Sequence, residues 1–112
     1  MHVTILSGRV SEENWRKLES DFERVIKHPP SGVVSSLLVQ CQSEPKLWQV
    51  ITTWESAAIY HESKERKIID VCFDLFCNDG SNPHRNEFTV FGKFTRVRRS
   101  ITSQKPLILL TE

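Results

Sequence analysis

The segment Leu47–Trp54 constrains the fold of this 112-residue chain more than any other part of it. Its residues, LWQVITTW, are mostly β-branched or aromatic, which favours a strand. Side chains along a strand alternate between the two faces of its sheet. Apolar side chains here fall on both faces: Leu47 and Ile51 on one, Trp48, Val50 and Trp54 on the other. Such a strand is typical of a sheet that is covered on both sides, so the fold has to supply two covers.

A strand and a helix are predicted ahead of this segment. Residues 3–10 alternate as a strand does. Ser11 is a suitable N-cap residue, and the helix dipole favours the glutamates that follow it at 12 and 13. One apolar stripe at helical spacing comes next, formed by Trp15, Leu18, Phe22, Val25 and Ile26. The helix should end at His28, because a residue that precedes proline avoids the α region.

A hairpin is predicted after this helix. Residues 33–41 read as a strand with Val33, Leu37 and Val39 on one face. The connection at 43–46 is short and contains proline, which is typical of a turn. This strand and Leu47–Trp54 should therefore pair antiparallel.

The rest of the chain supplies a second helix and a fourth strand. Ser56 is suited to cap a helix, and the charged residues 62–67 should divide that helix into two pieces near Lys64. After a loop at 78–83, Phe88–Phe94 alternates as the fourth strand. A basic segment at 93–99 then leads to an apolar tail at 106–110.

The predicted order of elements is β-α-β-β-α-β plus a tail strand. This is the ferredoxin-like α+β arrangement, a four-stranded antiparallel sheet with two helices on one face. We expect one domain at residues 1–96 and a tail strand at 97–112. The helices leave the second face of the sheet bare, and a large apolar face of this kind is an interaction surface. The sequence therefore predicts a homodimer that packs sheet on sheet, with the tail strand on the partner subunit.

Charge and cysteine content restrict the partners and the cellular compartment of the protein. The net charge of +1 indicates no nucleic-acid partner. Three cysteines, an odd number, argue against a disulfide scaffold and favour a reducing compartment. The first ten residues lack the basic start and apolar run of a signal peptide. The apolar stretches are all shorter than the roughly 18 residues that span a bilayer. We expect a cytoplasmic protein with no membrane contact.

One arrangement within residues 1–94 combines the turn with Pro30 and Gly32, the hairpin, and the strand ending in Trp54-Glu55-Ser56 before a helix. This arrangement resembles the antibiotic-biosynthesis-monooxygenase (ABM) type of dimeric α+β barrel. The resemblance implies a homodimer in which two sheets build a barrel, with a pocket in each subunit between sheet and helices. Some members of the family are cofactor-independent monooxygenases of aromatic, quinol-like molecules. Others degrade heme, and many have no known activity.

The chain departs from the pattern of the heme-degrading branch. That branch uses an Asn in the first strand, a Trp in the second helix and a His about ten residues later. The corresponding positions here hold Ser7 or Gly8, then Ser63, then Phe73. The histidine that many members carry on the second helix is also replaced, by Ser63 or Arg66, with His61 on another face. Heme degradation is therefore not expected.

Five residues are candidates for a site. His61 is the candidate catalytic residue, a proton acceptor at the pocket mouth, since imidazole titrates near neutral pH; the alternative is a solvated helix face. Trp54 and Tyr60 are candidates for stacking on a flat ligand, or they are simply core. His84 and Asn86 are candidates for hydrogen bonds to a substrate oxygen, or they satisfy turn backbone.

Neither a metal nor a cofactor is predicted. His61-Glu62-Ser63-Lys64-Glu65 lacks the second histidine of a zinc helix, and Cys72 and Cys77 are not at a zinc or redox spacing. Two functions stay open. One is a cofactor-independent monooxygenase of an aromatic or quinol-like small molecule. The other is a non-catalytic ligand-binding or dimerisation module.

Overall fold

A computed structural model describes residues 1–65, 76, 83–98 and 110–111. Four strands form one sheet: β1 (His2–Arg9), β2 (Val33–Gln40), β3 (Leu47–Trp54) and β4 (His84–Thr89). A short 3-10 turn, η1 (Glu12–Asn14), leads into α1 (Trp15–Ile26), and α2 (Ala57–Glu65) follows β3. Two short strands, β5 (Val97–Arg98) and β6 (Leu110–Thr111), pair with each other. None of the helices described is long and apolar enough to cross a membrane.

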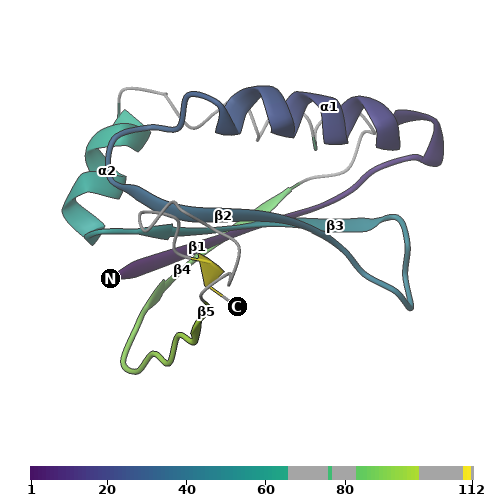
Figure 1. The fold of residues 1–112 in the computed structure, drawn as a ribbon. Helices are drawn as coiled ribbons and strands as arrows, with labels where there is room; N and C mark the ends of the chain where they lie inside the picture. Colours follow the sequence, from purple (N-terminus) through teal and green to yellow (C-terminus); the bar gives the residue numbers. More distant parts are fainter. Residues whose placement is uncertain (66–75, 77–82, 99–109, 112) are drawn as a thin grey trace.

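The sheet has the predicted ferredoxin-like α+β topology. Its strand order is β2-β3-β1-β4, and every neighbouring pair is antiparallel. α1 lies across one face of the sheet, and α2 lies beside the end at which β1 begins (Figure 1). The predicted cap of α2 is confirmed, because the Ser56 hydroxyl accepts a hydrogen bond from the Ile59 backbone N–H at 3.2 Å.

The core lies between α1 and the sheet. The helix contributes Leu18 and Phe22, and β3 contributes Trp48 and Val50, all buried. The stripe predicted from the sequence thus meets one face of the predicted strand. Full burial of a side chain of this kind contributes about 1.5–3 kcal/mol, so this contact holds the helix on the sheet.

Gly8 makes room in this core for an aromatic ring from a distant part of the chain. A Cβ atom built at Gly8 would lie 2.6 Å from side-chain carbons of Phe76. Phe76 is fully buried within the core cluster. Only glycine lets the ring approach β1 this closely.

The opposite face of the sheet is apolar and carries no helix among the residues that the structure describes. Val3 and Ile5 of β1 lie there beside Ile51 of β3, as the cross-strand register shows. The flanking strands add Leu37 and Phe88, which are 59% and 47% exposed. Both faces of β3 are therefore apolar, as the sequence indicated, but the residues that the structure describes cover only one of them.

The prediction for β2 was wrong at its first residue. The register shifts between Val33 and Ser35, so Val33 turns to the face that α1 covers, whereas Leu37 stays on the open face. A bulge inserts one extra residue and reverses the alternation beyond it. Strict alternation from the sequence had placed Val33 and Leu37 together.

The fourth strand also begins and ends earlier than predicted. Its ladder runs from His84 to Thr89 because its partner β1 starts at His2, which pairs with Thr89. Phe91 and Phe94, placed in this strand by the sequence, lie beyond it and are 96% and 78% exposed.

The predicted capping of the first helix by Ser11 is also wrong. Its side chain makes no capping hydrogen bond, since η1 intervenes and α1 begins only at Trp15. The Ser11 carbonyl instead accepts a hydrogen bond from the Asn14 N–H at 2.9 Å. A break in the second helix was predicted near Lys64; α2 is continuous through Lys64 to Glu65, and the residues that follow it lie outside the described residues. Of the loop predicted at 78–83, residues 78–82 also lie outside them.

Candidate functional site

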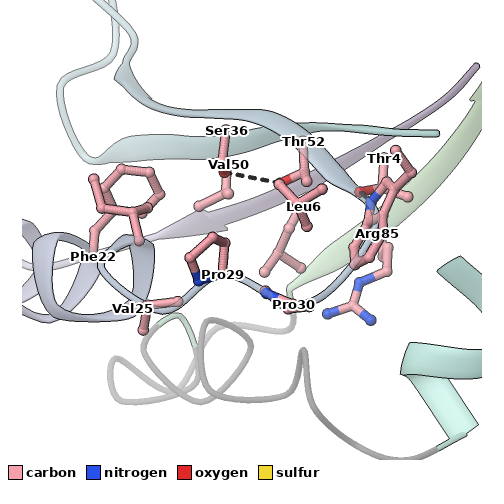
Figure 2. A pocket seen from close by; sticks show the side chains of 13 residues that line it. Thr4, Leu6, Phe22, Val25, Pro29, Pro30, Ser36, Val50, Thr52 and Arg85 are labelled. Carbon is pink, nitrogen blue, oxygen red and sulfur yellow. Dashed lines mark hydrogen bonds between the residues drawn. The ribbon is translucent and has the colours of Figure 1, made fainter. Parts of the chain in front are cut away.

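A pocket lies between the sheet, the C-terminal half of α1 and the Pro29–Pro30 turn (Figure 2). Together with its open mouth it has an empty volume of about 630 Å³, and the centre of a water molecule can occupy about 70 Å³ of it. One water needs roughly 10–15 Å³ in that measure, so the interior holds about five waters, similar to one small ring. The residues around it are Thr4, Leu6, Phe22, Val25, Ile26, Pro29, Pro30, Val33, Ser36, Val50, Thr52, Trp54 and Arg85.

Most of this lining is apolar because it is the core surface near the end of α1. Leu6 and Val50 belong to the core cluster, and Phe22 reaches the pocket from the helix. Pro29 and Pro30 form the wall beyond the helix, where they also stop it (Figure 2). An apolar lining with a few polar groups is typical of a site for a small organic ligand.

Hydroxyl groups form a row across the floor of the pocket. Ser36, Thr52 and Thr4 are cross-strand partners on β2, β3 and β1, so their side chains share one face. The Ser36 and Thr52 hydroxyls are hydrogen-bonded to each other at 3.0 Å. This row is the polar part of an otherwise apolar floor, and it can exchange hydrogen bonds with a ligand oxygen.

Arg85 supplies the positive charge of the pocket. Its guanidinium lies at the end of the pocket away from Phe22 (Figure 2). It reaches the helix-facing side because its cross-strand partner on β1 is the buried Leu6. Sequence reasoning missed Arg85 because it started β4 too late; a strand that begins at His84 puts Arg85 on the same face as the core.

The turn that walls the pocket is fixed by Gly32. This residue has a φ of +90°, a conformation that favours glycine. A Cβ at this position would collide with the Ile59 side chain of α2. The Gly32 carbonyl accepts a hydrogen bond from the Glu55 N–H at 2.8 Å, just beyond β3. The turn, the end of β3 and α2 are therefore held together.

Of the residues predicted for the pocket, Trp54 lines it, whereas Tyr60 does not line it and packs against Trp54. Trp54 is only 2% exposed, and its indole N–H donates to the Thr4 hydroxyl at 3.2 Å. The Tyr60 ring meets Trp54 edge-on, with ring centroids 5.2 Å apart, and is fully buried. Both residues thus have core contacts as well as a place at or near the pocket.

His84 and Asn86 lie on the other face of the sheet. Their cross-strand partners are Ser7 and Ile5, which face away from α1, and both are exposed. The structure does not bring them to this pocket within one subunit, and their role in substrate binding stays a prediction.

His61 belongs to a separate cluster. Its Nε2 lies 3.3 Å from Glu87 Oε1, and His2 Nε2 lies 3.1 Å from the same oxygen. The Tyr60 ring packs against both imidazoles, with centroids 5.2 Å and 5.3 Å away. None of His2, His61 and Glu87 lines the pocket. The predicted proton-acceptor role of His61 stays a prediction.

Comparison with known proteins gives a fold-level answer. No protein-family model matches the chain, and no curated protein matches it. Solved structures do. The heme-degrader MhuD from Mycobacterium tuberculosis, solved with two hemes in its active site, superposes with a TM-score of 0.65 at 20% identity over 84% of this chain and 99% of that one.

Two oxygenases are similar in the same way. SnoaB, a cofactor-independent oxygenase from Streptomyces nogalater, gives a TM-score of 0.61 at 15% identity, covering 82% of this chain and 95% of that one. An antibiotic biosynthesis monooxygenase gives 0.64 at 11% identity, covering 82% and 100%. At these identities the likeness concerns the fold. The resemblance seen in the sequence is confirmed at that level: this chain has the ferredoxin-like α+β fold of the antibiotic-biosynthesis-monooxygenase type.

Proposed function

We propose that this chain binds a compact aromatic or quinol-like molecule in the pocket beneath α1 and oxidises it as a cofactor-independent monooxygenase. The observation that carries the proposal is the pocket itself, an apolar space beside Trp54 and Phe22 with hydroxyls on its floor and one cation at its end. The similarity in fold to SnoaB, a cofactor-independent oxygenase, gives independent support. Fold alone does not decide function, so the residues of the pocket carry the proposal.

The reaction balances with dioxygen as the only co-reactant. A hydroquinone and O₂ give a hydroxyquinone and water. The quinol hydroxyl gives its proton to a water molecule, the resulting anion passes an electron to O₂, and a carbon–oxygen bond forms. The O–O bond then breaks, one oxygen stays on the ring as the hydroxyl, and the other leaves as water. The protein has to bind the ring, favour the anion and exclude bulk water.

Arg85 is suited to favour the anion. A positive charge within a few ångströms of a phenol favours its ionised form and lowers its pKa. A ring that fills the pocket displaces its water, which strengthens this interaction. The guanidinium carries five donors, so other hydrogen bonds at Arg85 leave it able to serve a bound oxygen as well. Thr52 and Ser36 can hold the second ring oxygen from the pocket floor.

A second candidate function is ligand binding without catalysis. One observation favours it: among the described residues that line the pocket, none is a histidine, carboxylate, cysteine or tyrosine. Arginine stays protonated and does not accept a proton. In this case the pocket holds its ligand and no chemistry follows.

We also propose that two chains pair through their open sheet faces. Leu37 and Phe88 leave about half of their surface exposed on that face, around the less exposed Ile5 and Ile51. A second copy would cover the bare side of β3. We place residues 1–96 in the domain and residues 97–112 in a tail that packs on the partner. We place the protein in the cytoplasm, in keeping with the free thiol of Cys41.

Binding and oxygen uptake, measured separately, test the two functions. Calorimetry with a series of hydroquinones reports binding, and an oxygen electrode reports turnover. We expect Arg85→Gln to reduce both, and Ser35→Ala, on the opposite face of β2, to change neither. Uptake with wild-type protein supports the monooxygenase. Binding without uptake replaces it with the second function, and the absence of both overturns the assignment of the pocket.

A further inference from the structure

We propose that His2, His61 and Glu87 form a binding site for a divalent first-row transition metal. The three residues come from β1, α2 and β4, and they lie outside the pocket. Their imidazole and carboxylate ligand atoms all lie within 4.8 Å of one another. This site goes beyond the proposed function, which needs no metal.

The distances are close to those of a metal site. Ligand atoms about 2.0–2.2 Å from a tetrahedral metal lie roughly 3.3–3.6 Å apart. Two of the three separations, His2 Nε2 and His61 Nε2 to Glu87 Oε1, are 3.1 Å and 3.3 Å. The remaining separation, between the two imidazole nitrogens, is within 4.8 Å. A small rotation of His61, whose side chain is 52% exposed, can close it.

Two of the ligands stand on rigid elements. His2 pairs with Thr89 and Thr4 with Glu87, so His2 and Glu87 are diagonal neighbours on one face of the β1–β4 ladder. The His2 side chain is 9% exposed, which restricts its rotamers. The buried Tyr60 ring stands beside both imidazoles and supports the turn of α2 that carries His61. The cluster is thus preorganised before any metal binds.

The ligand set indicates the class of metal. Two imidazoles and one carboxylate suit Zn²⁺, Fe²⁺, Co²⁺, Ni²⁺ or Cu²⁺, whereas Ca²⁺ and Mg²⁺ prefer oxygen ligands. Glu87 and His61 are 34% and 52% exposed, so water can reach the remaining coordination position. Three protein ligands with one open position are the usual arrangement in zinc sites that bind a further molecule.

A simpler explanation is that Glu87 only accepts hydrogen bonds from the two histidines. In that case the nitrogens keep their protons and no metal displaces them. The two explanations differ in a measurable way, since a hydrogen-bonded cluster gives no stoichiometric metal binding.

The test uses the full, untagged chain, freed of metal by a chelator. Zinc titration by calorimetry should give one equivalent per chain. Glu87→Gln and His61→Asn should each weaken zinc binding by about tenfold or more. His28→Asn, which changes an exposed histidine after α1, is the matched control and should leave it unchanged. Melting curves of the metal-free variants show that they are folded.

Cobalt titration identifies the ligands independently. A site of two imidazoles and a carboxylate gives the visible d–d bands of Co²⁺ without thiolate charge-transfer absorption. Thiolate absorption would assign the metal to the cysteines, and that result overturns the proposal, as does an absence of binding at micromolar concentrations. Quinol binding and oxidation, measured in the presence of chelator, keep the fate of the pocket separate from that of the metal site.

Discussion

The hydrogen bond between the Trp54 indole and the Thr4 hydroxyl can be measured with a double-mutant cycle. The donor is buried at 2% exposure and lies 3.2 Å from Thr4 Oγ1. Thr4→Val keeps the shape of the side chain and removes the acceptor, which leaves the indole N–H without this partner. An unsatisfied buried donor costs about 1–3 kcal/mol of unfolding free energy.

The second variant, Trp54→Phe, removes the donor and part of the ring. We expect it to cost about 1–2 kcal/mol from the space left at the pocket wall, plus roughly 1 kcal/mol for the Thr4 hydroxyl left unpaired. In the double variant neither group is orphaned, so only the loss of volume remains. The double variant should therefore be about 2–4 kcal/mol more stable than the sum of the two single changes predicts.

Urea denaturation measures the free energy of unfolding of the wild type, the two single variants and the double variant. All four are measured at one protein concentration, because pairing of chains would make stability depend on concentration. The control is Thr53→Val. Thr53 is on β3 with Trp54 but on the opposite face of the sheet, so Thr53→Val should show no coupling to Trp54→Phe. Costs that add within about 0.5 kcal/mol would refute the hydrogen bond and with it the account of how Trp54 is held at the pocket.

Three further outcomes are expected. Gly32→Ala should lower the free energy of unfolding, measured in urea, by about 2 kcal/mol or more, because alanine disfavours a φ of +90° and its Cβ would collide with the Ile59 side chain. A cost below about 0.5 kcal/mol would show that the turn can relax. Hydrogen bonds from the Ser43 hydroxyl and, to a smaller extent, from the Glu44 backbone lower the pKa of Cys41, so Ser43→Ala should raise that pKa. Alkylation of Cys41 near neutral pH, followed by mass spectrometry, should then be slower, and an unchanged rate contradicts the hydrogen bond. Leu37→Asp should convert the dimer that we propose into monomers in sedimentation equilibrium, and a wild-type monomer would itself rule out pairing through the open face.

The sequence predicted the fold because its patterns are local. The stripe from Trp15 to Ile26 and the alternation of Leu47–Trp54 each need only neighbouring residues, and both match the structure. The bulge after Val33 was not predictable in this way, since an extra residue in a strand leaves the composition of the strand unchanged.

The candidate site was less predictable, because it depends on register between distant strands. Which of His84, Arg85 and Asn86 faces α1 is decided by where β4 meets β1, and nothing near residue 84 encodes that. The contact between His2 and Glu87 joins residues 85 positions apart, so no local motif announces it. Trp54 was found because its position at the junction of strand and helix is itself a local pattern.

The place of β1 in the sheet has a consequence for the order of folding. Of the four strands in the sheet, β1 comes earliest in the chain, yet it lies between β3 and β4 and pairs with residues that are made much later. The β2–β3 hairpin can form early from nearby residues, whereas closing β1 onto β4 encloses most of the chain. The pocket and the histidine cluster both need β4, so neither is complete until β4 has paired with β1, and a nascent chain that stops before residue 84 has neither.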